Sequence, residues 1–270
     1  MILNLRTFAS GLALVCLCAS AAGEAAALSR EEMAAATVSD DFSMPTPGEL
    51  FAALNKQGKV DWAGKYRVPI ATSYTSRAKM ALNLGGLIAD GYIAVEAEDA
   101  QQVKNLGKDI LALAKGLGVP KEILDRGKSL KDKADGKQWD VLKEELEATQ
   151  NEVKLSMAAN KDSDLIDLVT VGGWIRGTDV ISGVIAENYT EASAKVLRQP
   201  GLASFLHGRL DRLPEKLRDD PAVKSSRMKL LEIQQVIALA RDQAPPVEAV
   251  KALHSLTTEL LKEISKKATK

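Results

Sequence analysis

The chain has 270 residues, of which 46% are hydrophobic and only 4% are aromatic. Basic and acidic residues number 36 each, and this zero net charge argues against a nucleic-acid binder, which needs a basic surface. Alanine and leucine form helices well, whereas strands prefer aromatic and β-branched residues. We therefore expect an all-α fold, a multi-helix bundle of about eight or nine helices.

The first residues have the pattern of a secretory signal peptide. Arg6 supplies the positive start, and residues 8–19 form an apolar run of 12 residues. Such a run is too short to span a bilayer as a helix. Small residues at Ala19 and Ala21 match a cleavage site after Ala21. We expect residues 1–21 to be removed and the mature protein to be periplasmic or secreted.

Both cysteines of the chain, Cys16 and Cys18, lie inside this signal segment. Cleavage would leave a cysteine-free protein, which excludes cysteine-ligated zinc, iron–sulfur clusters and covalently attached haem. A lipoprotein would need a small residue before the acceptor cysteine, but Val15 and Leu17 stand there. The pattern thus argues against a lipid anchor.

Helix start and stop signals divide the rest into a flexible leader, residues 22–45, and one all-helical domain, residues 46–270. Thr46 followed by Pro47 favours a helix start, and Asp99 is a good N-cap. No run alternates as a strand would. The predicted helices cover about residues 46–56, 70–97, 99–117, 120–134, 139–159, 164–187, 221–242 and 247–267, with shorter helices after Thr190 and Pro200.

Two of these helices, 70–97 and 164–187, are apolar nearly all round and should therefore be buried at the centre. Each contains glycines, although glycine inside a helix costs about 0.5–1 kcal/mol relative to alanine. The structural interpretation is close backbone approach at a helix crossing, and the functional one is space for a ligand between the helices. The glycines in question are Gly85, Gly86, Gly172, Gly173, Gly177 and Gly183.

The two segments also resemble each other. Residues 84–88 (LGGLI) stand 87 positions before residues 171–175 (VGGWI). Two related halves packed about a pseudo-twofold axis would explain this, and so would a chance match between glycine-rich helices.

Charged residues interrupt these apolar helices and are costly there unless they are paired. Arg176 and Asp179 lie one turn apart, which argues against a membrane span in the mature chain. One interpretation is a set of internal ion pairs, with Asp179 or Glu187 as partner of Arg176 or with pairs between the two helices. The other is an anion site built from Arg77 and Arg176 with Tyr74 and Tyr92 as its wall.

The chain lacks the motifs of familiar catalytic or metal sites. His207 and His254 have no second ligand at metal-binding spacing, so a surface or helix-cap role is expected for both. No metal and no cofactor is expected. Three hypotheses remain: a non-enzymatic binding or structural module of the periplasm or cell envelope, a carrier of an apolar or amphipathic ligand between the central helices, and, with least support, an enzyme. The partner would be a protein or a small apolar ligand.

Overall fold

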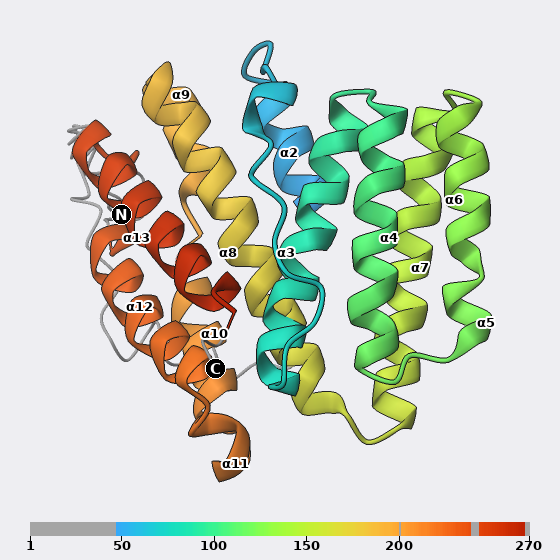
Figure 1. Ribbon diagram of the computed structural model, residues 1–270. Coiled ribbons are helices and arrows are strands. Elements are labelled where there is room, and N and C mark those ends of the chain that lie inside the picture. Colours follow the sequence, from blue (N-terminus) through green and yellow to red (C-terminus); the bar gives the residue numbers. More distant parts are fainter. Residues whose placement is uncertain (1–46, 200, 239–242, 268–270) are drawn as a thin grey trace, which may run out of the picture.

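A computed structural model describes residues 47–199, 201–238 and 243–267, and within these ranges the protein is all-helical with no strand (Figure 1). The predicted all-α class is therefore confirmed. The signal peptide, its two cysteines and the leader up to Thr46 lie outside the described residues. None of the described helices is both long and apolar enough to cross a membrane.

The helices follow one another with short connections. Local side-chain caps explain several starts: Asp99 accepts from the amide of Gln102, and Thr190 and Ser193 form a capping box. The α-helices are α2 (Pro47–Asn55), α3 (Arg77–Glu96), α4 (Ala100–Gly116), α5 (Lys121–Leu124), α6 (Arg126–Asp135), α7 (Trp139–Ala159), α8 (Ser163–Glu187), α9 (Glu191–Ala194), α10 (Leu202–Asp211), α11 (Glu215–Arg218), α12 (Pro221–Ile237) and α13 (Val247–Ser265). Two 3₁₀ turns, η1 (Ala63–Lys65) and η2 (Lys195–Leu197), complete the described elements.

The start of the first central helix differs from its prediction. Residues 70–76 are not helical, and α3 begins only at Arg77. The hydroxyl of Ser76 caps it by accepting from the amide of Lys79 at 3.0 Å. Tyr74 stands in the preceding loop and donates its hydroxyl to the carbonyl of Ser265, 3.2 Å away. This long-range contact holds residues 70–76 as a loop, although their apolar spacing predicts a helix.

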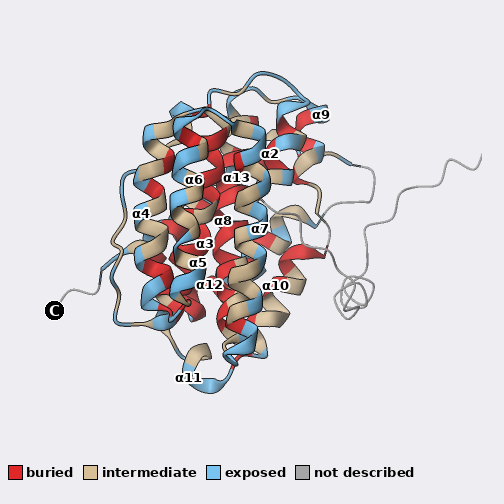
Figure 2. Ribbon diagram, turned by 90° about the vertical axis from the view of Figure 1, so that its right-hand side faces the viewer, coloured by how far each residue is buried: buried red, intermediate tan, exposed pale blue. Residues whose placement is uncertain are grey.

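Helix α8 runs through the centre of the molecule, with α3 packed along it (Figure 1). On one side α3, α4, α6 and α7 form a ring in which each helix contacts the next. On the other side α13 packs on α8, and α12 and α10 follow. Figure 2 shows the buried residues concentrated on α3 and α8, while the outer helices are largely intermediate or exposed.

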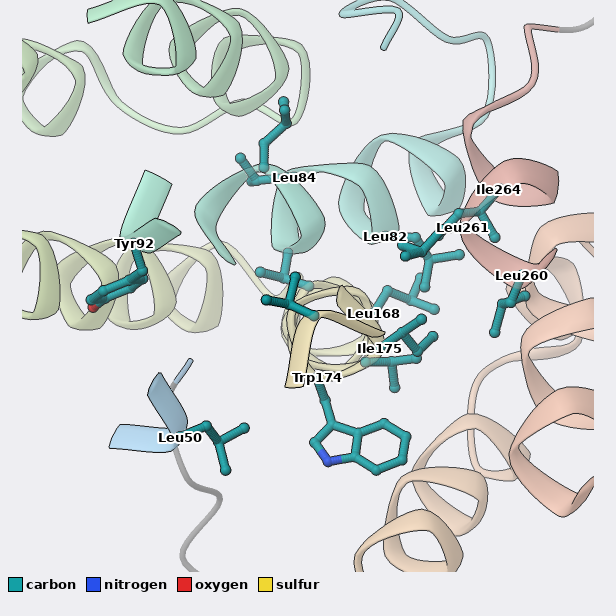
Figure 3. Close-up of a cluster of buried hydrophobic side chains, with 14 of the residues drawn as sticks. Leu50, Leu82, Leu84, Tyr92, Leu168, Trp174, Ile175, Leu260, Leu261 and Ile264 are labelled. Atoms are coloured by element: carbon teal, nitrogen blue, oxygen red, sulfur yellow. The ribbon is translucent and has the colours of Figure 1, made fainter. Parts of the chain in front are cut away.

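The crossing of α3 and α8 depends on two glycines. An added Cβ at Gly85 would lie 1.9 Å from the carbonyl oxygen of Val169, and one at Gly172 would lie 1.9 Å from that of Leu82. The two backbones are therefore in direct contact. Figure 3 shows Leu82, Leu168, Ile175, Leu260 and Ile264 gathered beside this crossing, where α13 joins it.

Candidate functional site

A cavity of about 580 Å³ lies inside the ring formed by α3, α4, α6 and α7, with α5 at one end. Its volume is within the usual range for small-molecule sites, about 300–1,000 Å³. Along α4 the lining extends from Gln101 to Ala114. At a rise of 1.5 Å per residue, this makes the cavity about 20 Å long. Leu84 and Tyr92 of α3 both line it, and in Figure 3 both point away from the cluster around Ile175.

The lining is mostly apolar, yet it is less tightly enclosed than the rest of the core. Leu168 and Ile175 on α8 have no exposed surface. Val103, Leu106 and Ala114 of α4 are buried, but several other apolar residues that α4, α6 and α7 turn toward the cavity are only partly buried, although they pack against the same core. Examples are Ile110, Leu130, Leu146 and Val153. This half of the bundle therefore keeps apolar surface that its own side chains do not cover.

Three buried polar atoms on the cavity lining have no hydrogen-bond partner among the described residues. These are the hydroxyls of Tyr92 and Thr149 and the side-chain carbonyl of Gln150. Tyr92 is only 2% exposed, and burial, with the nearby charges of Glu147 and Glu49, raises the pKa of its hydroxyl. A buried polar atom without a hydrogen bond costs about 1–3 kcal/mol, so native proteins have few of them. A polar ligand group within hydrogen-bond distance of any of these atoms would remove that cost.

Gly107 stands at the middle of the stripe that α4 presents to the cavity. Val103, Ile110 and Ala114 lie on the same face of the helix and line the same space. An added Cβ at Gly107 would meet no atom within 4 Å. Packing therefore does not require a glycine at position 107, unlike at Gly85. A glycine here leaves room for a ligand, which is a physical reason for its presence.

A second polar cluster is buried next to the crossing of α3 and α8. The guanidinium of Arg176, 4% exposed, donates from Nε to Asp90 and from Nη1 to Asp179, both at 2.7 Å. Its third nitrogen, Nη2, donates to the carbonyl of Lys65 at 2.7 Å. The second oxygen of Asp90 accepts from Nε of Arg67, also at 2.7 Å. The network joins α3, α8 and the loop before α3.

Helix α13 completes this cluster around Asp179. The carboxylate of Asp179 accepts from the hydroxyl of Thr258 at 2.6 Å. Nδ1 of His254 lies 3.3 Å from the same carboxylate and 2.9 Å from the backbone carbonyl of Asp179. Because both neighbours are acceptors, Nδ1 carries the hydrogen. Burial alone would raise the pKa of Asp179, but His254, Arg176 and Thr258 together lower it. The two carboxylates likewise outweigh burial and raise the pKa of Arg176.

The contact with His254 predicts a pH dependence of stability. The hydrogen bond to Asp179 raises the pKa of His254 above 6.5, against partial burial, and the charge of Glu187 adds to it. The protonated ring thus stabilises the fold below about pH 6.5, and this contribution is lost as the pH rises through the folded pKa. We expect the urea midpoint of the wild type to fall between pH 6 and 8 more than that of His254→Gln. The effect is modest and salt-sensitive, since the side chain is 43% exposed.

His207 is the matched control, because burial and the charge of Arg227 lower its pKa although Asp211 lies 3.1 Å away. Its contribution to stability is lost as the pH falls, so His207→Gln should change the pH profile in the opposite sense. Equal profiles for wild type and His254→Gln would show that the contact with Asp179 adds no stability.

The residues predicted as a ligand site do not lie together. Arg176 and Asp179 form the buried ion pair, with Asp90 rather than Glu187 as the second partner of Arg176. Arg77 instead binds both oxygens of Asp162, at 3.0 and 2.8 Å. It lies 13 residues before Asp90 on α3, which corresponds to about 20 Å.

The two tyrosines are also apart. Tyr92 lines the cavity, while Tyr74 stands in the loop before α3, where burial raises its pKa to about 12. The remaining glycines have separate neighbours. An added Cβ at Gly86 would contact Arg67, and one at Gly173 would contact the backbone of Gly85. An added Cβ at Gly177 would contact Leu50, and one at Gly183 would contact His254.

The cavity itself brings in residues that the sequence reasoning left out. Thr149 and Gln150 belong to α7, whose charge pattern suggests a solvated helix. They share a face with Leu146 and Val153, so an uncharged polar pair within an apolar stripe was the available signal. His254, expected at a surface or cap, contacts Asp179 because α13 packs on α8.

Within the described ranges, no group of three or more His, Cys, Asp or Glu side chains is placed to hold a metal ion. No protein-family model, curated protein or solved structure matches the chain.

Proposed function

We propose that this protein is an exported, non-enzymatic binding protein of the periplasm or cell envelope that carries one small amphipathic ligand in the cavity among α3, α4, α6 and α7. The cavity is the observation that supports the proposal most. Its apolar walls offer hydrophobic burial, and the unpaired polar atoms of Tyr92, Thr149 and Gln150 show that its lining is not completed by protein contacts in the described ranges. Export rests on the signal pattern of residues 1–21.

This location differs from the one that the glycine pattern suggested. Between α3 and α8 the backbones touch at Gly85 and Gly172 and leave no room for a ligand. The cavity lies on another face of α3, which Leu84, Ile88 and Tyr92 line. A binding role is favoured over a purely structural one because a structural bundle would gain stability by filling this space.

Native mass spectrometry of the protein purified from its natural source tests the proposal directly. A mass starting after Ala21 together with a retained small molecule would support both export and binding. Retention of the N-terminal segment would contradict the export. The carrier role would be contradicted if no small molecule is retained and the protein also fails to bind 1-dodecanol, an uncharged amphiphilic probe.

Substitutions at Gly107 give a sharper test of the cavity. Gly107→Phe places a large side chain in the middle of the α4 stripe, and we expect it to weaken 1-dodecanol binding at least about tenfold. Gly107→Ala adds one methyl group where no atom lies within 4 Å. It should raise the free energy of unfolding by about 0.5–1 kcal/mol and change affinity little.

Titration calorimetry measures the binding, and urea denaturation followed by circular dichroism measures the stability. If Gly107→Phe binds 1-dodecanol as tightly as Gly107→Ala does, the ligand lies elsewhere and the cavity is not the site.

A further inference from the structure

The charged residues of the cavity lining are all of one sign. Lys104 and Lys108 come from α4, Lys128 and Lys131 come from α6, and no aspartate or glutamate of the described part of the chain lines the space. This is unexpected in a chain with 36 basic and 36 acidic residues. The lining therefore combines an apolar interior with cationic side chains on two adjacent helices.

These lysines lie along the line where α4 and α6 meet. Lys104 of α4 binds Asp135 of α6 at 2.7 Å, and further along an added Cβ at Gly127 of α6 would meet Leu111 of α4 at 2.8 Å. The helices are antiparallel and in side-chain contact at both levels. One turn from Lys104 is Lys108, and one turn from Asp135, in the same direction, is Lys131. Two lysines thus face each other between the two contacts.

Lys108 and Lys131 are exposed, and neither forms an ion pair with a carboxylate of the described residues, although Asp109 lies within electrostatic range of Lys108 and Asp135 within that of Lys131. An anion placed between the two ammonium groups would be attracted to both. The opposite wall of the cavity is unsuited to an anion, because the charges of Glu147 and Glu49 lie near the Tyr92 hydroxyl. An anionic group is therefore favoured on the α4–α6 side alone.

Size limits the apolar part of the ligand. At about 30 Å³ for each water-sized group, a cavity of about 580 Å³ holds about twenty non-hydrogen atoms. Together with a length of about 20 Å, this fits one extended alkyl chain.

We propose that the cavity binds a single-chain anionic amphiphile, with its alkyl chain along α4 and its head group between Lys108 and Lys131. This inference rests on the proposed function, since it names the class of ligand for the same cavity. A carboxylate and a phosphate monoester share the required chemistry, and the experiment separates them.

The test compares three probes of equal chain length, dodecanoate, dodecyl phosphate and 1-dodecanol, by titration calorimetry on protein freed of bound lipid and refolded. We expect at least one anion to bind about three- to tenfold more tightly than the alcohol at low salt. The advantage should shrink in 0.5 M NaCl, where charges are screened. The anion that gains more identifies the head group.

The double variant Lys108→Gln/Lys131→Gln should remove this advantage and leave 1-dodecanol binding unchanged. Lys115→Gln/Lys262→Gln removes the same charge from exposed positions outside the lining and is the control for net charge. It should retain the preference for the anion.

The outcomes separate the two proposals. If 1-dodecanol binds as tightly as both anions, the anionic class is wrong while the carrier role stands. If the double variant keeps the preference for the anion, the head group does not lie between Lys108 and Lys131. If none of the three probes binds to the folded wild-type protein, the proposed function itself is wrong.

Discussion

Replacing Gly85 or Gly172 by alanine is expected to lower the free energy of unfolding by more than about 3 kcal/mol, or to prevent folding. The added Cβ would lie 1.9 Å from a backbone carbonyl oxygen in each case, that of Val169 or of Leu82. A clash with a side chain can be relieved by another rotamer, but backbone against backbone forces α3 and α8 apart. Separation would expose the core that both helices bury.

Two other alanine substitutions make this prediction specific. At Gly173 the added Cβ would lie 3.4 Å from the nearest atom, an ordinary contact, so Gly173→Ala should be close to neutral. At Gly107 the space is open, and Gly107→Ala should stabilise the protein. Urea denaturation of the four variants measures the order. Wild-type stability for Gly85→Ala and Gly172→Ala would show that α3 and α8 do not cross at these glycines.

The helical class and most helix positions could be predicted because their signals are local. Asp99 and Thr190 cap the helices that follow them, and α7 has the bounds that its pattern predicts. The start of α3 could not be predicted, because the Tyr74 hydroxyl is held by Ser265, 191 residues further on. The predicted helix from Pro120 is two, α5 and α6, which meet at Asp125.

The Arg176 cluster and the cavity could be predicted from the sequence even less than the helices. The pairing of Arg176 with Asp179 follows from their spacing of three residues on one helix. The contacts of Arg176 with Asp90 and the Lys65 carbonyl depend on how α3 and the preceding loop pack on α8. The cavity is harder still, since it is a property of four helices that fail to fill the space between them. A sequence pattern reports which residues face inward but not how closely they meet.

The internal resemblance of residues 84–88 and 171–175 stays a hypothesis. Both segments lie at the crossing of α3 and α8, as a pseudo-twofold axis there would require. The elements that follow differ in length, since α4 has 17 residues and α9 has four. Duplicated halves would therefore have diverged outside the crossing itself.

Replacing Arg176 by methionine is expected to lower the free energy of unfolding by about 3–5 kcal/mol. Methionine fills a similar volume, so the loss would come from charge: Asp90 and Asp179 would stay buried without their shared partner. The stability of Arg176→Lys should lie between that of the wild type and that of Arg176→Met. Three acceptors each bind a different guanidinium nitrogen, and one ammonium group cannot reproduce this geometry.

Arg77→Met is the matched control for this substitution, because it also removes an arginine that pairs with an aspartate. Its side chain is 48% exposed, and exposed pairs contribute about 0.2–1 kcal/mol, so the expected loss is small. Urea denaturation at pH 7 compares the variants. A loss for Arg176→Met no larger than that for Arg77→Met would mean that water reaches Asp90 and Asp179 once the arginine is gone. In that case the contacts between α3, α8 and α13, rather than the ion pairs, hold this part of the core.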